Sequence, residues 1–288
     1  MIRTILVPST GNDSDRTVLA SALAVARQFG AHVDVLHSRV DALSIGSMVS
    51  AEATSAKLIA DLIERIETEA DEREQRAKQL FESFCRGEGL EISETPGGAA
   101  SVSAAWIREL GTERDCVVEY GRTADLLVIG PPGDGKEPLL ETLEAALLNT
   151  GRPLLIPALT PTAGLPATVV IAWKSTPEAA RAVTAAMPFL SIAKQIEIVT
   201  VAEGENGIDE REAVRLMTNL RWHGFPVSLS RLKPDANGAV ETLLAAVRER
   251  SALLVMGGYG HSRLREWIFG GFTRRVLRGA EVPVLIAH

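Results

Sequence analysis

Three short apolar runs occur in the same order in both halves of the chain. In the first half the runs are Thr4–Pro8, Asp125–Gly130 and Gly151–Pro157. Their counterparts in the second half are, in the same order, Thr168–Ala172, Ala252–Gly257 and Glu281–Ile286. This repetition predicts two copies of one structural unit rather than a short-period solenoid. The segment 160–166 is rich in turn residues and predicts a linker, so we expect domains at 1–159 and 167–288.

Each unit alternates apolar runs with segments of helical periodicity. Runs that are apolar throughout are typical of parallel strands covered on both faces, and the alternation predicts doubly wound α/β sheets. Strands are expected at 3–8, 32–38, 104–108, 125–129, 153–157, 168–173, 195–201, 227–232, 252–256 and 282–287. Helices are expected at 13–29, 52–85, 113–122, 139–149, 177–190, 209–223, 238–250 and 263–278.

Composition excludes several classes of protein. The chain has 288 residues and a net charge of −7, so it lacks the basic field that non-specific nucleic-acid binding requires. Its apolar runs fall short of the ~20 residues that span a bilayer, and its N-terminus lacks the flanks of a signal peptide. Cys85 and Cys116 have no metal or redox spacing and suggest free thiols in a reducing cytoplasm.

A glycine-rich loop follows the apolar run 252–256. Its spacing is Gly257-x-x-Gly260-x9-Gly270-Gly271, with Thr273 close behind. Glycines between a strand and a helix let the backbone turn sharply and expose N–H groups to an anion, which the helix dipole also favours. Ligands of doubly wound sheets bind beyond the carboxyl ends of the strands, where Gly257 falls. Such loops also occur for packing alone, and spacing does not decide between the two.

The glycine spacing, followed by a helix that ends in Val276–Ile286, resembles the nucleotide-binding signature of the universal stress protein family. The resemblance extends to both units and implies a tandem protein. It implies open five-stranded parallel sheets of strand order 3-2-1-4-5, like those of adenine nucleotide hydrolases. It further implies pairing of the two last strands, within the chain or in a homodimer, and ATP binding without clear turnover in many members.

The resemblance also implies roles for single residues. Gly257, Gly260 and Gly270 would hold ribose and phosphate, while Gly271, Phe272 and Thr273 would face the phosphates. Val201 would meet the adenine through its backbone, and Trp173, Lys174 and His261 complete the expected site. The expected ligand is ATP, with AMP and ADP as alternatives, and Mg²⁺ could accompany ATP.

Two positions depart from the family pattern. Many ATP-binding members have Ser or Thr where this chain has Gly271, and many have Asp where it has Lys174. Lys174 could face phosphate or point into water, and the sequence leaves both readings open. His261 could contact phosphate or belong to a solvated basic helix start, together with Arg263 and Arg265.

The first unit departs further. Gly130-x4-Gly135-Lys136 mimics a P-loop, but Glu137 stands where the loop needs Ser or Thr for Mg²⁺, and two prolines remove N–H donors. We therefore expect a first domain that binds no nucleotide and serves packing or partner recognition. The charged helix 52–85 is expected to be a solvated, ion-paired face, with an interaction arm as the alternative.

Three functions are compatible with the sequence. The first is a cytoplasmic stress-response protein whose second domain binds an adenine nucleotide as a regulatory ligand. The second is a scaffold of the same fold without nucleotide, which Gly271 and Lys174 favour. The third is a slow ATPase or nucleotidyl hydrolase, although no catalytic residue or metal ligand set is apparent.

Overall fold

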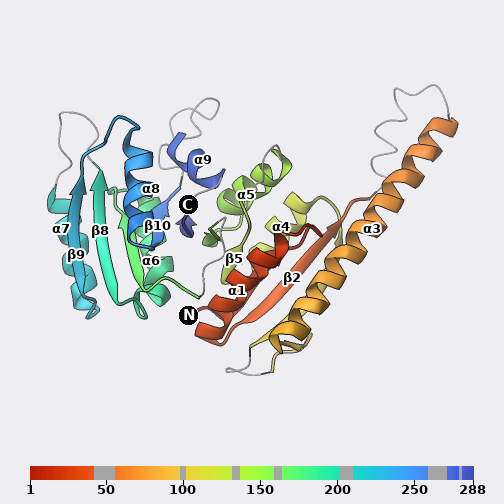
Figure 1. The fold of residues 1–288 in the computed structure, drawn as a ribbon, viewed down its shortest axis with the longest axis horizontal. Helices are drawn as coiled ribbons and strands as arrows, with labels where there is room; N and C mark the ends of the chain where they lie inside the picture. Colours follow the sequence, from red (N-terminus) through yellow and green to blue (C-terminus); the bar gives the residue numbers. More distant parts are fainter. Residues whose placement is uncertain are drawn as a thin grey trace.

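A computed structural model describes residues 1–41, 56–97, 102–131, 137–158, 164–201, 210–258, 271–278 and 281–288 (Figure 1). The strands are β1 Thr4–Pro8, β2 His32–Arg39, β3 Glu91–Ile92, β4 Ser103–Leu110, β5 Leu126–Val128, β6 Leu154–Ile156, β7 Thr168–Ala172, β8 Gln195–Val201, β9 Val227–Leu232, β10 Leu253–Gly257 and β11 Val284–Ala287. The helices are α1 Asp15–Phe29, α3 Ala56–Glu88, α4 Glu113–Gly121, α5 Glu137–Asn149, α6 Pro177–Leu190, α7 Glu210–Trp222, α8 Ala239–Glu249 and α9 Gly271–Leu277. The sequence therefore predicted these elements well, apart from the short β3.

The strands form one 11-stranded sheet of order β3-β4-β2-β1-β5-β6-β11-β10-β7-β8-β9. Within it, β4-β2-β1-β5-β6 and β9-β8-β7-β10-β11 each have the order 3-2-1-4-5, which confirms the predicted topology. We call residues 1–158 and 164–288 the first and second halves. Their assignment as separate domains stays a prediction, because the two halves share the sheet.

The halves meet through the last strand of each. Val284, Leu285 and Ile286 of β11 pair antiparallel with Ile156, Leu155 and Leu154 of β6. All other strand pairs of the sheet are parallel. The pairing of last strands that the sequence led us to expect thus occurs inside the chain.

Two hydrophobic cores lie on opposite faces of the sheet, and each extends through both halves. Successive strand residues alternate between them, so that Ile5 and Val7 enter the first core and Leu6 enters the second. Helices α1, α3, α6 and α7 cover the first core, and α4, α5, α8 and α9 cover the second. At the boundary of the halves, Phe29 of α1 meets Phe189 of α6 edge to face, with ring centroids 5.5 Å apart.

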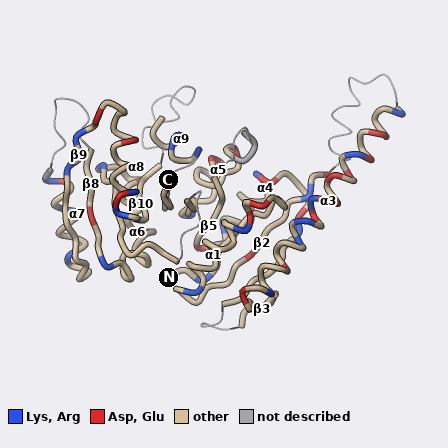
Figure 2. The backbone as a smooth tube through the Cα atoms, viewed as in Figure 1, with Lys and Arg blue, Asp and Glu red and all other residues tan. Residues whose placement is uncertain are grey.

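Helix α3 is the longest helix and runs beyond the body of the molecule (Figure 1). Figure 2 shows that charges of both signs are interspersed along it, as the sequence predicted for a solvated, ion-paired face. Among the described residues, no helix combines the length and apolar character needed to cross a bilayer.

We predict that Leu285→Ala lowers the free energy of unfolding by about 2–5 kcal/mol, because it empties a buried position in the strand that joins the halves. Urea denaturation followed by circular dichroism measures this change. Leu58→Ala is the matched control: Leu58 is 66% exposed, so the control should stay within about 0.5 kcal/mol of wild type. A second transition unaffected by Leu285→Ala would show that the halves unfold separately.

Candidate functional site

The candidate site lies at the carboxyl edge of the second half, where β7, β8 and β10 end side by side. Ala172 of β7 pairs with Val199 of β8 and with Met256 of β10. Trp173 and Gly257 come next along β7 and β10, and Val201 is the last residue of β8; the sequence had assigned all three to the site. The structure therefore brings together three of the expected site residues at one edge of the sheet.

Gly257 is required at the end of β10 by a close approach of α6. A Cβ added to Gly257 would lie 2.5 Å from the backbone N of Ala179 and 2.7 Å from the carbonyl carbon of Glu178. Both atoms belong to the backbone of the first turn of α6 and cannot move away as the end of a side chain could. The first turn of α6 is thus a direct neighbour of the strand end from which the glycine loop departs.

The first half of the chain also touches this edge. A Cβ on Gly258 would lie 2.9 Å from the Leu147 Cδ2 atom of α5. Gly258 N donates to the carbonyl of Ala287 at 2.9 Å, and the His288 ring lies 3.0 Å from the Gly258 carbonyl. The beginning of the glycine loop is therefore fixed by β11 and by a helix of the first half.

Helix α9 returns the chain from the loop. Gly271 opens it on the surface, and a Cβ there would meet no heavy atom within 4 Å. Phe272 is half-buried against the second core, and Thr273 is 4% exposed and already engaged within the protein. We therefore expect any contact of Thr273 with a phosphate to be made by its backbone N–H and not by its hydroxyl.

Ion pairs join α9 to two neighbouring helices. Arg274 Nε lies 3.5 Å from Glu144 of α5, and Arg275 Nε donates to Glu241 of α8 at 2.8 Å. These contacts tie α9 to both halves.

The remaining predicted site residues divide into two groups. Lys174 is exposed and takes part in a contact of its own, while Val201 and Trp173 are half-buried. Gly260, His261 and Gly270 lie outside the described residues, as does most of the P-loop mimic at 130–136. Their roles stay predictions.

Sequence reasoning missed Glu178. This residue lies in the first turn of α6, which begins after the Thr176 cap, where an acidic residue is routinely explained by the helix dipole. Its side chain is only 14% exposed, and its Oε2 atom is buried without a hydrogen-bond partner in the part of the chain that the structure describes. The Trp173 Nε1 atom is in the same condition.

The corresponding edge of the first half is filled by protein groups. Asp15, at the start of α1, accepts hydrogen bonds from the Thr10 and Gly11 backbone N–H groups at 2.8 Å and from the Ser9 hydroxyl at 2.9 Å. A Cβ on Gly11 would lie 2.8 Å from the Arg73 carbonyl of α3. Asp15 thus accepts these hydrogen bonds from the loop after β1, and the loop packs closely against α3.

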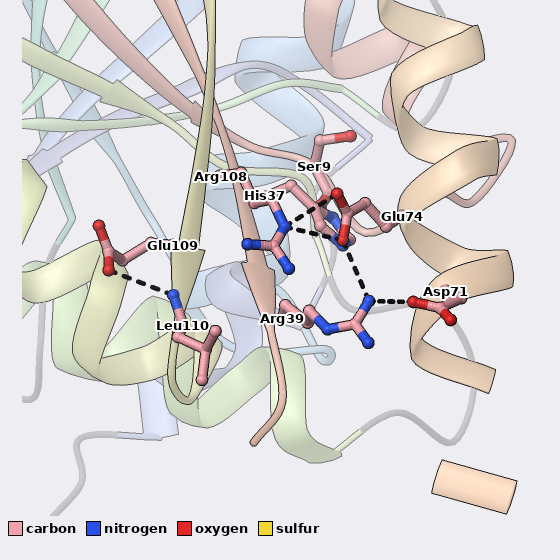
Figure 3. A network of polar contacts seen from close by, with 8 residues as sticks. All are labelled: Ser9, His37, Arg39, Asp71, Glu74, Arg108, Glu109 and Leu110. Carbon is pink, nitrogen blue, oxygen red and sulfur yellow. Dashed lines mark hydrogen bonds and ion pairs between the residues drawn. The ribbon is translucent and has the colours of Figure 1, made fainter. Parts of the chain in front are cut away.

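Helix α3 also covers the ends of β2 and β4 in the first half (Figure 3). Glu74 accepts hydrogen bonds from Arg39 Nη1 at 3.2 Å and Arg108 Nε at 2.9 Å, and Arg39 also pairs with Asp71. Burial alone would raise the pKa of Glu74, but the hydrogen bonds and charges of the two arginines outweigh burial and lower that pKa. This network fixes α3 across the carboxyl edge.

The described residues offer no set of three His, Cys, Asp or Glu side chains that could hold a metal. Cys85 and Cys116 are free, as the sequence predicted, and both are buried. Burial raises the pKa of Cys85 to about 11 and also raises that of Cys116, so neither thiol is activated. His32 lies between Ser103 and Asp34, and His37 contacts the Ser9 carbonyl and stacks on Trp106.

Part of the chain matches the model of a known protein family. The model of the "Universal stress protein family" matches residues 183–288, which contain β8, β10, α9 and the glycine loop. This stretch of the chain is similar to universal stress proteins. The fold of the chain, α/β with a mostly parallel sheet, resembles that of solved universal stress proteins.

Relatives of similar length are also universal stress proteins. Universal stress protein Slr1230 of Synechocystis sp. is 22% identical over 300 residues, covering 99% of each chain. A crystal structure of a universal stress protein from Archaeoglobus fulgidus has 17% identity and a TM-score of 0.67, covering 99% of this chain and 95% of the other. A universal stress protein solved in complex with cAMP is 20% identical, covers 55% of this chain and 99% of its own, and has a TM-score of 0.31.

We predict that Glu74→Gln lowers the free energy of unfolding by about 1 kcal/mol at neutral pH, because the amide cannot form the charged pairs with Arg39 and Arg108. The pKa of Glu74 is lower in the folded state than its ordinary value of 4.5, so the stabilisation is complete above that value. It is lost as pH falls through the folded-state pKa, and wild type and variant should then converge.

Urea denaturation at several pH values tests this prediction. Glu72→Gln is the matched control, because Glu72 is 62% exposed and pairs with Arg76 at 3.6 Å on the same helix. It should change stability by less than about 0.5 kcal/mol. An effect of Glu74→Gln that is the same at every pH would contradict the ionic explanation.

Proposed function

We propose that this chain is a universal stress protein and that it binds ATP, or a related adenine nucleotide such as AMP or ADP, at the carboxyl edge of its second half. The ligand would act as a regulatory signal in a cytoplasmic stress-response protein. The observation that carries the proposal is the arrangement at Gly257, where β10 ends beside β7 in close contact with α6, directly before the glycine signature in the sequence. This is the edge at which doubly wound sheets bind ligands.

The contrast between the two halves supports one nucleotide site rather than two. In the first half, Asp15 occupies the backbone N–H groups of the loop after β1, and α3 covers the ends of β2 and β4. A phosphate there would displace satisfied hydrogen bonds and meet a carboxylate. We therefore assign packing, not nucleotide binding, to the first half.

Residues of the second half would hold the nucleotide as follows. The N–H groups of the loop and of Gly271 and Phe272 would face the phosphates, while the Val201 backbone would face the adenine. Mg²⁺, if it accompanies ATP, would be held mainly by the phosphates, since the described residues provide no carboxylate set for it. We assign no catalytic role to these residues.

A scaffold that binds partners without nucleotide is the second candidate. It is favoured by two specific observations, the lack of a hydroxyl at Gly271 and the presence of Lys174 where a carboxylate is common in the family. Titration of the protein with ATP separates the two candidates, since a scaffold of this kind would give no binding heat.

We predict that calorimetry detects ATP binding by the wild type and that Gly260→Glu abolishes it. The new carboxylate would lie in the glycine loop and repel the phosphates. Gly133→Glu, in the corresponding loop of the first half, is the matched control and should bind like the wild type. Absence of binding by the wild type would refute the nucleotide proposal, and turnover lost with Gly260→Glu would instead favour an enzyme.

We further predict that Gly271→Ser strengthens ATP binding about tenfold, because an added hydroxyl could donate to a charged phosphate oxygen. The open space around Gly271 accommodates the side chain. Gly87→Ser, at an equally open position on α3, is the control and should leave the affinity unchanged. Unchanged or weaker binding by Gly271→Ser would show that the phosphates do not approach this end of α9.

A further inference from the structure

Ser9 and Trp173 occupy the same position in the two halves of the sheet. Ser9 directly follows β1, and its backbone N–H donates to the Leu36 carbonyl of β2 at 2.8 Å. Trp173 directly follows β7, and its N–H donates to the Val199 carbonyl of β8 at 2.9 Å. The preceding residues are also in matching register, since Pro8 pairs with Leu36 and Ala172 with Val199.

Each of these residues is followed by a carboxylate in the first turn of the next helix. In the first half, the Ser9 hydroxyl donates to Asp15 Oδ2 at 2.9 Å. The backbone N–H groups of Thr10 and Gly11 donate to the same carboxylate. Asp15 is 5% exposed. The donor after the strand and the acceptor in the helix are therefore hydrogen-bonded to each other, and we call this a closed pair.

In the second half, the corresponding pair is open. Glu178 Oε1 accepts from Arg181 at 3.1 Å, but Glu178 Oε2 and Trp173 Nε1 are both buried and find no hydrogen-bond partner in the described part of the chain. Leaving a buried donor or acceptor unsatisfied costs roughly 1–3 kcal/mol, so native proteins nearly always supply a partner. One unused donor and one unused acceptor thus remain where the first half has a closed pair.

This open pair adjoins the proposed nucleotide site. Trp173 directly follows β7, the strand next to β10, and a Cβ on Gly257 would strike the peptide bond between Glu178 and Ala179. The Glu178 carboxylate would repel phosphate, so it suits the neutral nucleoside end of a nucleotide. A neutral group that accepts one hydrogen bond and donates another would satisfy both atoms.

We propose that Trp173 Nε1 and Glu178 Oε2 bind the nucleoside part of the ligand, with Trp173 donating to it and Glu178 accepting from it. This inference rests on the proposed nucleotide site. Two parts of adenosine have the required chemistry: the ribose hydroxyls, and the adenine edge with its amino group and neighbouring ring nitrogen. Glu178 thereby provides the carboxylate that Lys174 replaces at the strand end.

The test is calorimetric titration of wild type, Trp173→Phe and Glu178→Gln with ATP, 2′,3′-dideoxy-ATP and ITP. Each variant should bind ATP about tenfold more weakly than the wild type, the usual effect of losing one hydrogen bond to a buried or charged partner. Dideoxy-ATP lacks the ribose hydroxyls and ITP lacks the amino group. The analogue that lacks the contacted group should bind the wild type more weakly than ATP does. The two substitutions should then change the affinity for that analogue only slightly.

Matched controls exclude general effects of the substitutions. Trp222→Phe changes a tryptophan that is 87% exposed on α7. Glu197→Gln changes a carboxylate that is 16% exposed and pairs with Arg250 at the opposite, amino end of β8. Both controls should bind ATP like the wild type, and melting curves establish that every variant is folded.

The possible failures are distinguishable. If the wild type binds ATP but both variants bind it equally well, the inference is overturned while the nucleotide site stands. If both analogues bind the wild type as tightly as ATP does, the nucleoside contact is overturned without any variant being needed. If the wild type binds no ATP, the proposed function fails and this inference with it.

Discussion

The antiparallel contact between β6 and β11 is the constraint on which the rest of the structure depends. It joins two sheets of identical topology through strands whose residues at the contact are all buried. Because neighbouring strand residues face opposite sides, the joint adds Leu155 and Leu285 to one core and their flanking residues to the other. Neither core is then complete in one half alone.

This joint also reaches the candidate site. Helix α5 of the first half supports the start of the glycine loop through Leu147 and pairs with α9 through Glu144. The carboxyl edges of the two halves have the same backbone arrangement but different side chains. In one half Ser9 and Asp15 are hydrogen-bonded to each other, whereas in the other Trp173 Nε1 and Glu178 Oε2 have no hydrogen-bond partner among the described residues. A half without a ligand can thus contribute to the position of ligand-binding groups in the other.

Most of the fold could be predicted from sequence because buried parallel strands are apolar throughout and alternate with amphipathic helices. β3 escaped prediction because Glu91 and Ile92 are too few to show a period, and their pairing with β4 is a tertiary effect. The predicted strand ended at residue 108, because Arg108 and Glu109 interrupt its apolar pattern, yet pairing with β2 carries β4 to Leu110. Glu178 could not be recognised because the sequence does not reveal whether an acidic group in a helix start is solvated or buried.

Using the two last strands internally has a further consequence for self-association. In the part of the chain that the structure describes, the outer strands of the sheet are β3 and β9. β3 is two exposed residues long, and β9 carries the exposed Ser228 and Arg231. Very short strands and charged side chains at sheet edges oppose the addition of further strands. The protein therefore resists polymerisation through its sheet, and assembly into larger complexes is directed to its helical surfaces.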